Sequence, residues 1–295
     1  MIRTLRPYIV SSARECLKGS QVWVIKIGSA LLTRDGVGID ARGIDGWCKQ
    51  ISVLLNDGKK VALVTSGAVA EGFRRLGFTE RPDSIHELQA AAAVGQMGIV
   101  QAYEKSFRHH SRRTALVLLT HDDLSDRQRY LNARGTLRTL LNYGIVPVIN
   151  ENDSVATDEI QLGDNDTLAA RVASLVSADV LVLLTDQKGL HEDDPRVRPD
   201  APMVSECSAF DSKLDAMVGS GSGALGRGGM VTKLEASRYA ARAGCHTVIA
   251  NGREQGILSA IANGRNVGTI LTADVAPLDA RKQWIAAQVQ SAGGI

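Results

Sequence analysis

Short apolar runs alternate along this chain with segments in which apolar residues recur every three or four positions. Runs of this kind, bounded by polar residues or glycine, are typical of buried strands, whereas the longer spacing is typical of helices that cover a sheet. The pattern predicts strands at residues 22–27, 61–64, 115–119, 145–149, 180–184, 247–250 and 267–271. It predicts helices at residues 44–55, 85–107, 168–176 and 230–243, and a more polar helix that ends at Gly144.

This regular alternation predicts an α/β fold with a mostly parallel central sheet sandwiched by helices. No internal repeat and no long linker interrupts the chain, so we expect a single domain at residues 21–295. Residues 1–20 form an N-terminal extension, for which we expect a short surface helix. Pro147 cannot donate a ladder hydrogen bond, and therefore predicts an irregular strand or one near a sheet edge. Ligands of such sheets bind beyond the carboxyl ends of the strands, where this chain has its most polar loops.

Composition narrows the choice of core and of partners. Hydrophobic residues make up 44% of the chain and aromatic residues only 4%, so the core must consist mainly of Ala, Val, Ile and Leu. The formal net charge is +2, from 34 basic and 32 acidic residues, which argues against nucleic acid or a membrane as a partner. Small anionic substrates stay compatible with this balance, because they require only local positive charge.

Cysteine usage indicates a cytoplasmic protein. Cys16, Cys48, Cys207 and Cys245 lie far apart and lack the spacing of zinc or redox motifs, which is typical of reduced thiols. The longest apolar runs have the length of strands and are too short to span a bilayer. Residues 1–20 lack the apolar centre of a secretory signal.

Two predicted strands are followed by small residues that suit an anion. Lys26 lies at the end of the first strand, and Gly28 follows it in a turn whose N–H groups can surround a phosphate. The alternative is a lysine whose side chain reaches the surface. Ser66 and Gly67 end the second strand and open a helix, where glycine admits a ligand and the helix N-terminus favours an anion. The alternative there is simple capping by Ser66.

The densest polar cluster follows the fourth strand. Residues 150–154 read Asn-Glu-Asn-Asp-Ser, and residues 163–166 read Gly-Asp-Asn-Asp. Such a cluster offers acceptors for an ammonium group, amides for a carboxylate, and carboxylates that can orient lysines. Solvated turns use the same residue types. A calcium loop is a rival interpretation, although the spacing and the final glutamate of an EF-hand are missing.

Two further segments are candidates for nucleotide contacts. Thr185 and Asp186 follow the fifth strand, and they either contact a nucleotide or its metal or merely end the strand. Residues 219–233 hold six glycines and lead into a helix whose first turn is expected to contain Thr232 and Lys233. This segment suits either a backbone cradle for phosphates or a flexible surface loop. A dinucleotide fingerprint is matched only formally, because no strand precedes it, and no P-loop signature occurs.

Taken together, these motifs resemble the amino acid kinase family from about residue 22 to residue 284. The strings that carry the resemblance are Val-Ile-Lys-Ile-Gly-Ser, Val-Thr-Ser-Gly-Ala, Leu-Asn-Ala-Arg, Val-Pro-Val-Ile-Asn-Glu-Asn-Asp, Gly-Asp-Asn-Asp, Leu-Leu-Thr-Asp-Gln-Lys-Gly-Leu, Gly-Gly-Met-Val-Thr-Lys and Arg-Lys-Gln-Trp-Ile. The strings at residues 150–153 and 163–166 are typical of the branch that phosphorylates glutamate. The resemblance implies a carbamate-kinase-like fold, with a glutamate-binding part at about residues 21–170 and an ATP-binding part at about residues 171–275.

The resemblance also implies an activity and the residues that perform it. The activity is ATP-dependent phosphorylation of the L-glutamate side-chain carboxylate to L-glutamyl 5-phosphate, the first step of proline biosynthesis. Lys26 and Lys233 would contact the migrating phosphoryl group, to which Gly28 and Gly67 offer N–H groups, and Asp166 would orient the lysines. The residues implied for glutamate are Ser66, Gly67, Asn150, Asp153 and Asn165. The residues implied for ATP are Lys26, Gly28, Thr185, Asp186, Arg227, Gly228, Gly229, Met230, Val231, Thr232 and Lys233.

Further ligands and partners follow from the same resemblance. Mg²⁺ would bridge the ATP phosphates, with no protein side chain assigned as its ligand. L-proline is an expected inhibitor, and a homo-oligomer (dimer or tetramer) and a glutamyl phosphate reductase are expected partners. Arg227 departs from the family, in which a small hydroxyl residue is frequent there. Many members carry a C-terminal RNA-modification-enzyme-like (PUA) domain, which we expect this protein to lack because the sequence ends soon after Trp284.

The chemistry agrees with the scattered histidines of this chain. A side-chain carboxylate with a pKa of about 4.3 is ionised at neutral pH, so the nucleophile requires no general base. The difficulty is that an anion attacks an anion, and lysines, Mg²⁺ and helix N-termini reduce this repulsion. The alternatives are a kinase for another carboxylate or carbamate, an inactive nucleotide-binding regulator, and an NAD-dependent dehydrogenase. Another substrate would require changes at residues 150–166. An inactive regulator would be favoured by loss of Lys26, Lys233 or Asp166, and a dehydrogenase would require a correctly placed glycine fingerprint.

Overall fold

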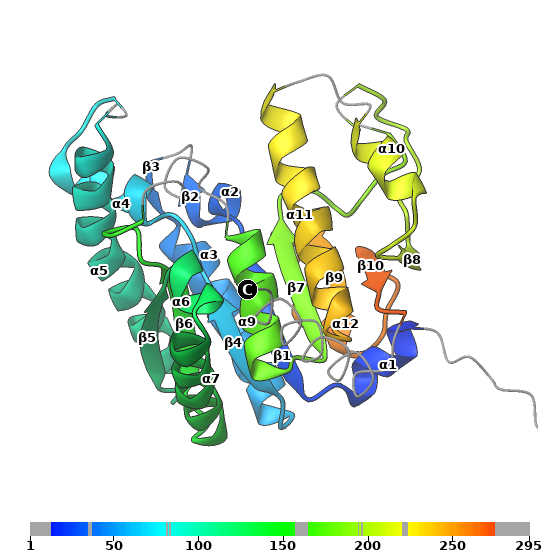
Figure 1. The fold of residues 1–295 in the computed structure, drawn as a ribbon, viewed down its shortest axis with the longest axis horizontal. Helices are drawn as coiled ribbons and strands as arrows, with labels where there is room; N and C mark the ends of the chain where they lie inside the picture. Colours follow the sequence, from blue (N-terminus) through cyan, green and yellow to red (C-terminus); the bar gives the residue numbers. More distant parts are fainter. Residues whose placement is uncertain are drawn as a thin grey trace, which may run out of the picture.

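The fold is built on a sheet of eight strands (Figure 1). The computed structural model describes residues 13–34, 37–80, 82, 84–156, 165–193, 195, 197–219 and 224–274. The strands of this sheet are β1 (Val22–Ile27), β4 (Lys60–Val64), β5 (Thr114–Leu119), β6 (Val146–Glu151), β7 (Val180–Thr185), β8 (Glu206–Ser208), β9 (His246–Asn251) and β10 (Thr269–Thr272). Their order across the sheet is β5-β6-β4-β1-β7-β9-β10-β8.

Neighbouring strands of this sheet run parallel except for β9 and β10. The predicted α/β class with a mostly parallel sheet is therefore confirmed. Residue 147 lies in β6, one strand away from the edge strand β5, as the proline at that position predicts. The ladder between β4 and β6 begins only at Leu63 and Val148. Residue 147 therefore need not donate a backbone hydrogen bond to β4, and a proline is tolerated there. A separate hairpin pairs β2 (Thr33–Arg34) with β3 (Val37–Ile39).

Helices cover both faces of the sheet, because alternate residues of a strand point to opposite faces. Trp23 and Ile25 of β1 belong to the core on one face, and Val24 belongs to the core on the other. The first core is covered by α1 (Ala13–Gly19), α3 (Ala41–Asn56), α5 (Ile85–His109) and α12 (Ile257–Ala262). The second is covered by α7 (Arg127–Asn142), α9 (Asp166–Val176) and α11 (Ala224–Arg242). The remaining helices are α2 (Ser29–Leu32), α4 (Ala68–Leu76), α6 (His121–Ser125) and α10 (Lys213–Gly219).

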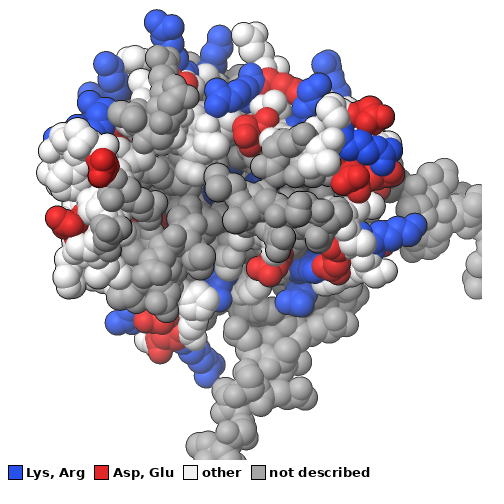
Figure 2. Space-filling view, turned by 90° about the horizontal axis from the view of Figure 1, so that it is seen from above, with Lys and Arg blue, Asp and Glu red and all other residues white. Residues whose placement is uncertain are grey.

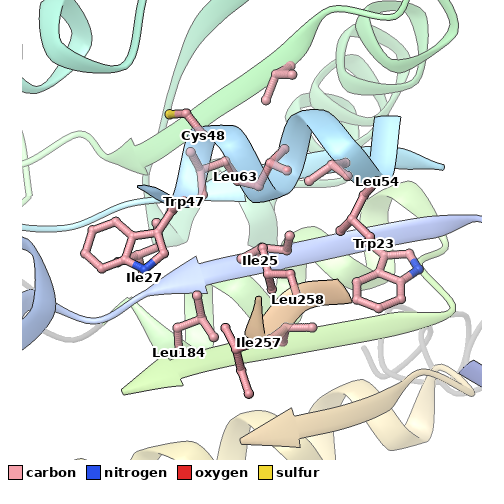
Figure 3. Close-up of a cluster of buried hydrophobic side chains, with 14 of the residues drawn as sticks. Trp23, Ile25, Ile27, Trp47, Cys48, Leu54, Leu63, Leu184, Ile257 and Leu258 are labelled. Atoms are coloured by element: carbon pink, nitrogen blue, oxygen red, sulfur yellow. The ribbon is translucent and has the colours of Figure 1, made fainter. Parts of the chain in front are cut away.

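Two tryptophans fill the first core and have their polar atoms satisfied. Figure 3 shows Trp23 on β1 and Trp47 on α3 at opposite ends of a cluster of aliphatic side chains. The indole nitrogen of Trp23 donates to Ser20 Oγ at 2.8 Å, and that of Trp47 donates to the carbonyl of Gly252 at 2.7 Å. A chain so poor in aromatic residues thus uses both rings to join the sheet, a helix and a loop.

The main difference from the sequence-based expectation is the start of α11. We expected a glycine-rich loop up to residue 229 and a helix from residue 230, whereas α11 begins at Ala224. Glycine lowers helix propensity by about 1 kcal/mol per residue. Packing of Leu234, Ala236 and Ala240 in the core beside α9 stabilises this helix and outweighs the local propensity. The described part of the chain contains no helix long and apolar enough to cross a membrane.

Candidate active site

The carboxyl ends of four neighbouring parallel strands meet at one edge of the sheet. These strands are β6, β4, β1 and β7, which end at Glu151, Val64, Ile27 and Thr185. Figure 2 views the molecule from above this edge, and the described Lys and Arg side chains lie on the same face as Asp and Glu side chains. Any attraction for an anion here must therefore come from particular buried charges rather than from a surface of one sign.

Three ionisable side chains meet below this edge. Nζ of Lys26, on β1, lies 2.6 Å from Oδ1 of Asp166, the first residue of α9. Nζ of Lys233, on α11, lies 2.9 Å from the other carboxylate oxygen of Asp166. Asp166 is fully buried, and Lys26 and Lys233 are 3% and 9% exposed. Buried charges are costly unless they are paired. The arrangement therefore indicates specific ion pairs in the interior and argues against lysine side chains that extend to the surface.

The position of Lys26 follows from the alternation along β1. Lys26 is two residues after Val24, so both side chains project from the sheet toward the face that α9 and α11 cover. The strand is paired with β4 on one side and with β7 on the other, and these two ladders hold the backbone from which the lysine projects. The two ammonium groups and the single carboxylate of Asp166 thus carry more positive than negative charge among themselves.

Thr232 and Lys233 lie in the third turn of α11, not in its first turn as the sequence led us to expect. Thr232 Oγ1 lies 3.3 Å from Asp166 Oδ2 and 3.2 Å from the carbonyl of Gly229, to which Lys233 also donates at 2.9 Å. This correction follows from the early start of α11. Residues 229–233 therefore belong to a helix and not to a loop.

A chain of side-chain amides lies beside the charged group. Asn165 donates from Nδ2 to the carbonyl oxygen of Thr65 at 2.7 Å and to Oδ1 of Asn150 at 2.8 Å. Asn150 in turn donates from Nδ2 to Oε1 of Gln96 at 2.7 Å. All four residues are buried. The predicted residues Asn150 and Asn165 are thus brought together, and the network adds Gln96 and Thr65, which the sequence analysis did not select.

A signal for Gln96 exists in the sequence. Ala92, Gln96, Ile99 and Tyr103 follow one another at helical spacing, and all four lie on the buried side of α5. A glutamine at such a position must find a partner in the interior. The periodicity of α5 could therefore have identified it as a candidate, although not its partner.

Ser66 and Gly67 open α4 next to this network. Ser66 is buried, and its hydroxyl oxygen has no hydrogen-bond partner among the described residues. Gly67 is the residue before α4 and has a φ of +86°, a conformation that disfavours residues with a side chain. A buried hydroxyl without a partner at a helix N-terminus fits a ligand that carries a carboxylate.

The close packing of α4 on α5 fixes the position of this turn. A Cβ atom on Gly95 of α5 would lie 1.8 Å from the carbonyl oxygen of Ala68, and one on Gly72 of α4 would lie 1.8 Å from that of Ala91. Glycine at both positions lets the two backbones approach within van der Waals distance. The turn at Ser66 is consequently held against the stretch of α5 that contains Gln96.

The structure places the other predicted residues less centrally. The N–H of Gly28 donates to the carbonyl of Leu184 at 3.0 Å. Its role toward a phosphoryl group stays a prediction. Thr185 donates from Oγ1 to Asp186 Oδ1 at 3.0 Å, and Asp186 is exposed. Asp153 lies in the turn that follows β6.

Some predicted residues lie outside what the structure describes. These are the stretch 157–164, which includes the first half of the Gly-Asp-Asn-Asp string, the side chain of Arg227, the surroundings of Gly228, and the string near residue 284. Gly229, Met230 and Val231 are described and belong to α11. Their contacts with ATP stay predictions, as do the catalytic roles of the three charged residues.

The side chains of the site also show which kind of metal binding is compatible with it. Among the described residues, no group of three or more His, Cys, Asp or Glu side chains could hold a metal ion. Mg²⁺ in kinase sites is bound through one or two carboxylates and the substrate phosphates, and it keeps several waters. The residues present thus fit an ion that is carried mainly by a nucleotide.

Comparison with known proteins defines the class first. The sequence profile of the amino acid kinase family matches residues 21–251, and the chain belongs to this family. Its fold is also that of a UMP kinase from Bacillus anthracis, with a TM-score of 0.58 over 87% of this chain and 97% of that chain, at 14% sequence identity. That likeness concerns the fold alone.

Similar curated proteins are more specific. A glutamate 5-kinase of Thioalkalivibrio sulfidiphilus (strain HL-EbGR7) is 58% identical over 284 residues, which cover 96% of this chain and 76% of that protein. A glutamate 5-kinase of Pseudomonas syringae pv. tomato (strain ATCC BAA-871 / DC3000) is 58% identical over 280 residues, 95% of this chain and 75% of that protein. The resemblance inferred from the motifs is therefore confirmed, and this chain spans about three quarters of the length of these relatives.

Proposed function

We propose that this protein transfers the γ-phosphoryl group of ATP to the side-chain carboxylate of L-glutamate, which yields L-glutamyl 5-phosphate and ADP. This reaction is the first step of proline biosynthesis. High identity to glutamate 5-kinases over nearly the whole chain supports the assignment. The structural observation that carries it is the pair of buried lysines on one carboxylate, Lys26 and Lys233 on Asp166.

The proposed step needs charge neutralisation more than acid–base catalysis. An oxygen of the ionised substrate carboxylate forms a bond to the γ-phosphorus, and the bond from that phosphorus to the bridging oxygen of ADP breaks. No proton has to be removed from the nucleophile. The ammonium groups of Lys26 and Lys233 stabilise the negative charge on the phosphoryl oxygens, and Asp166 holds both in position.

Mg²⁺ is the cofactor that we expect to accompany ATP. When it is bound together with ATP, it would reduce the negative charge of the phosphates. Residues 229–233 of α11, with Thr185 and Asp186, are proposed to bind the nucleotide. Their position at the carboxyl edge of β7 and on the same helix as Lys233 supports this.

We propose that glutamate binds on the other side of the lysines. Ser66, Asn150 and Asn165 lie around the end of β4, and the buried hydroxyl of Ser66 has no partner in the described part of the chain. Asp153, in the turn after β6, is proposed to contribute a carboxylate. The two substrates would thus meet at Lys26, which lies on the strand between β4 and β7.

Regulation and location are proposed on the family resemblance. L-proline is expected to compete around the glutamate site, and the labile acyl phosphate is expected to pass to a glutamyl phosphate reductase. A homo-oligomer is expected as well. In the described part of the chain none of the four cysteines forms a disulfide, which agrees with a reducing compartment such as the cytoplasm.

The direct test is glutamate-dependent release of ADP from ATP and Mg²⁺, followed in a coupled assay with and without L-proline. Aspartate, N-acetylglutamate and UMP serve as control acceptors. We expect turnover with glutamate alone and its inhibition by proline. Turnover with one of the control acceptors, and none with glutamate, would show that the chain is another kinase of the family.

A further inference from the structure

Gln96 is a buried polar residue that the proposed reaction has not yet used. It lies on α5, is 8% exposed, and accepts a hydrogen bond at Oε1 from Nδ2 of Asn150. Its own Nε2 is buried and has no hydrogen-bond partner in the described structure. A buried amide donor without a partner costs about 1–3 kcal/mol of the free energy of unfolding. A glutamine at this position therefore lowers the stability of the protein, which is expected only where the residue has a function.

The direction of the amide chain does not depend on how the side-chain amides are assigned. The nitrogen and oxygen of an asparagine or glutamine amide look alike, and their assignment is inferred from their partners. Here one partner is the backbone carbonyl of Thr65, which can only accept. Asn165 must therefore present Nδ2 to Thr65 and, with its second hydrogen, to Asn150 Oδ1. Asn150 must then present Nδ2 to Gln96, which is left to accept with its oxygen.

This direction determines what Asn165 can offer a ligand. Both of its N–H groups are used inside the protein, and its Oδ1 accepts no hydrogen bond from the described residues. The side chain can therefore present only an acceptor. A carboxylate would be repelled by that oxygen, whereas an ammonium group would donate to it. The residue next to Asn165 in the chain is Asp166, which holds the two lysines, so both residues belong to the same site.

We propose that Gln96 is a positioning residue that makes the site select an amino acid over a dicarboxylate without an amino group. Its oxygen holds Asn150, Asn150 holds Asn165, and Asn165 directs its oxygen to the α-ammonium group of the substrate. The close contact of α4 and α5 keeps Gln96 at the required distance, because Gly95 is its neighbour in the chain. This inference rests on the proposed function, since it concerns the specificity of the same site.

The test compares the binding of L-glutamate and of glutarate, which has both carboxylates but no ammonium group. Isothermal titration calorimetry is performed on the full chain in its wild-type form and in three variants. Gln96→Met keeps the length of the side chain and removes the acceptor, whereas Gln96→Glu keeps an oxygen that can accept from Asn150. Gln101→Met, on the exposed side of the same helix, is the matched control.

We expect Gln96→Met to bind glutamate about tenfold more weakly, because about 1.4 kcal/mol, the contribution of one hydrogen bond, corresponds to a factor of ten. Its affinity for glutarate and for ATP should change less than about threefold. Gln96→Glu should recover most of the preference for glutamate, and Gln101→Met should match the wild type. If glutarate binds too weakly to measure, the change in glutamate affinity relative to ATP affinity decides the question.

Different failures have different meanings. If wild-type protein binds no glutamate, the proposed function is wrong. If it binds glutamate and Gln96→Met binds it equally well, Gln96 is not a positioning residue. If Gln96→Met loses glutamate and glutarate affinity in equal proportion, its role is structural and the inference is overturned. If thermal unfolding shows that Gln96→Met does not fold, the Gln96→Glu variant decides. An unchanged preference of this variant for glutamate over glutarate supports the inference. An equal loss of affinity for both ligands overturns it.

Discussion

Oδ2 of Asp166 lies 2.9 Å from Nζ of Lys233, although the two residues stand on different helices and 67 positions apart in the chain. The other oxygen of the same carboxylate lies 2.6 Å from Nζ of Lys26. One buried carboxylate thus holds two ammonium groups from distant parts of the chain. One lies on a strand near its start, and the other lies on a helix near its end. The arrangement keeps both ammonium groups in place before any substrate binds.

Replacing Lys233 tests this arrangement. Lys233→Ala should lower kcat for glutamate phosphorylation at least about a hundredfold, because one contact to the developing charge contributes roughly 3 kcal/mol to the barrier. The midpoint of thermal unfolding should show that the variant remains folded. Lys105→Ala, at an exposed position of α5, is the matched control and should leave kcat unchanged. Wild-type turnover in Lys233→Ala would remove this lysine from the mechanism.

The sequence predicted the sheet well for a physical reason. Strands such as β1 and β7 are buried on both faces, and their continuous apolar runs are visible without any knowledge of their neighbours. The start of α11 was not predicted, since its stability depends on packing against α9 and its glycines disfavour a helix. The reversed direction of β10 was not predicted either, because strand direction leaves no mark on apolar periodicity.

The site was predicted unevenly. Lys26 and Lys233 were first selected by their positions beside predicted elements. Their joint role with Asp166 came from a resemblance to known sequences, because no spacing rule joins residues so far apart. Their meeting point depends on the strand order, which places β1 beside β7. Gln96 carried a local signal in the periodicity of α5, but its partner Asn150 lies on another element. Amide chains of this kind become visible only once the tertiary contacts are known.

Gly95→Ala should destabilise the protein strongly. The added methyl group would meet the carbonyl oxygen of Ala68 at 1.8 Å, so α4 and α5 would have to separate. Overpacking of this kind costs about 1–3 kcal/mol of the free energy of unfolding, measured by urea denaturation. Gly135→Ala on α7 is the matched control: no atom lies within 4 Å of its new Cβ, and it should gain about 0.5–1 kcal/mol. Equal effects of the two substitutions would contradict the role of the close helix contact.

Arg14 should contribute strongly to the stability of the protein, although it lies near the start of the chain. Its guanidinium donates to the backbone carbonyls of Ser205, Arg265, Val267 and Gly268. Arg14→Ala leaves these acceptors without their donor, and we expect a loss of about 3 kcal/mol in the free energy of unfolding. Faster amide hydrogen exchange in β8 and β10 should accompany the loss.

The control for Arg14 lies on the same helix. Lys18 pairs with Glu15 at the surface, at 2.7 Å, and both side chains are more than half exposed. Exposed pairs of this kind contribute less than about 1 kcal/mol. A loss in Lys18→Ala as large as that in Arg14→Ala would indicate that the helix α1 itself, and not the buried guanidinium, determines the stability.

Glu71 should make the stability depend on pH in the acid range. Burial alone raises the pKa of its carboxyl, but hydrogen bonds from Arg74 and Arg75, together with the N–H of Ile39, outweigh burial and hold the pKa below its ordinary value of 4.5. A lowered pKa in the folded state contributes stability that is complete above the ordinary value. That contribution is lost as the pH falls from about 4.5 through the lower pKa of the folded state. Urea denaturation at pH values from neutral into this range measures the loss.

Two variants separate Glu71 from other acidic groups. Glu71→Gln should be less stable at neutral pH and should lose less stability on acidification than the wild type. Glu104→Gln, which removes an exposed pair with Arg108 on α5, should follow the pH dependence of the wild type. A pH dependence in Glu71→Gln as steep as that of the wild type would exclude Glu71 as its source.

The strand order has a consequence for synthesis on the ribosome. β1 is hydrogen-bonded on one side to β4 and on the other to β7, with Trp23 opposite Val180, a partner that is made much later. At about 5–20 residues per second, the nascent chain carries β1 with the backbone N–H and C=O groups of one edge unpaired for roughly 8–30 s. An open edge of this kind invites pairing with other chains. Translation pauses before residue 180 should therefore increase aggregation, and binding of nascent-chain chaperones should concentrate in that interval.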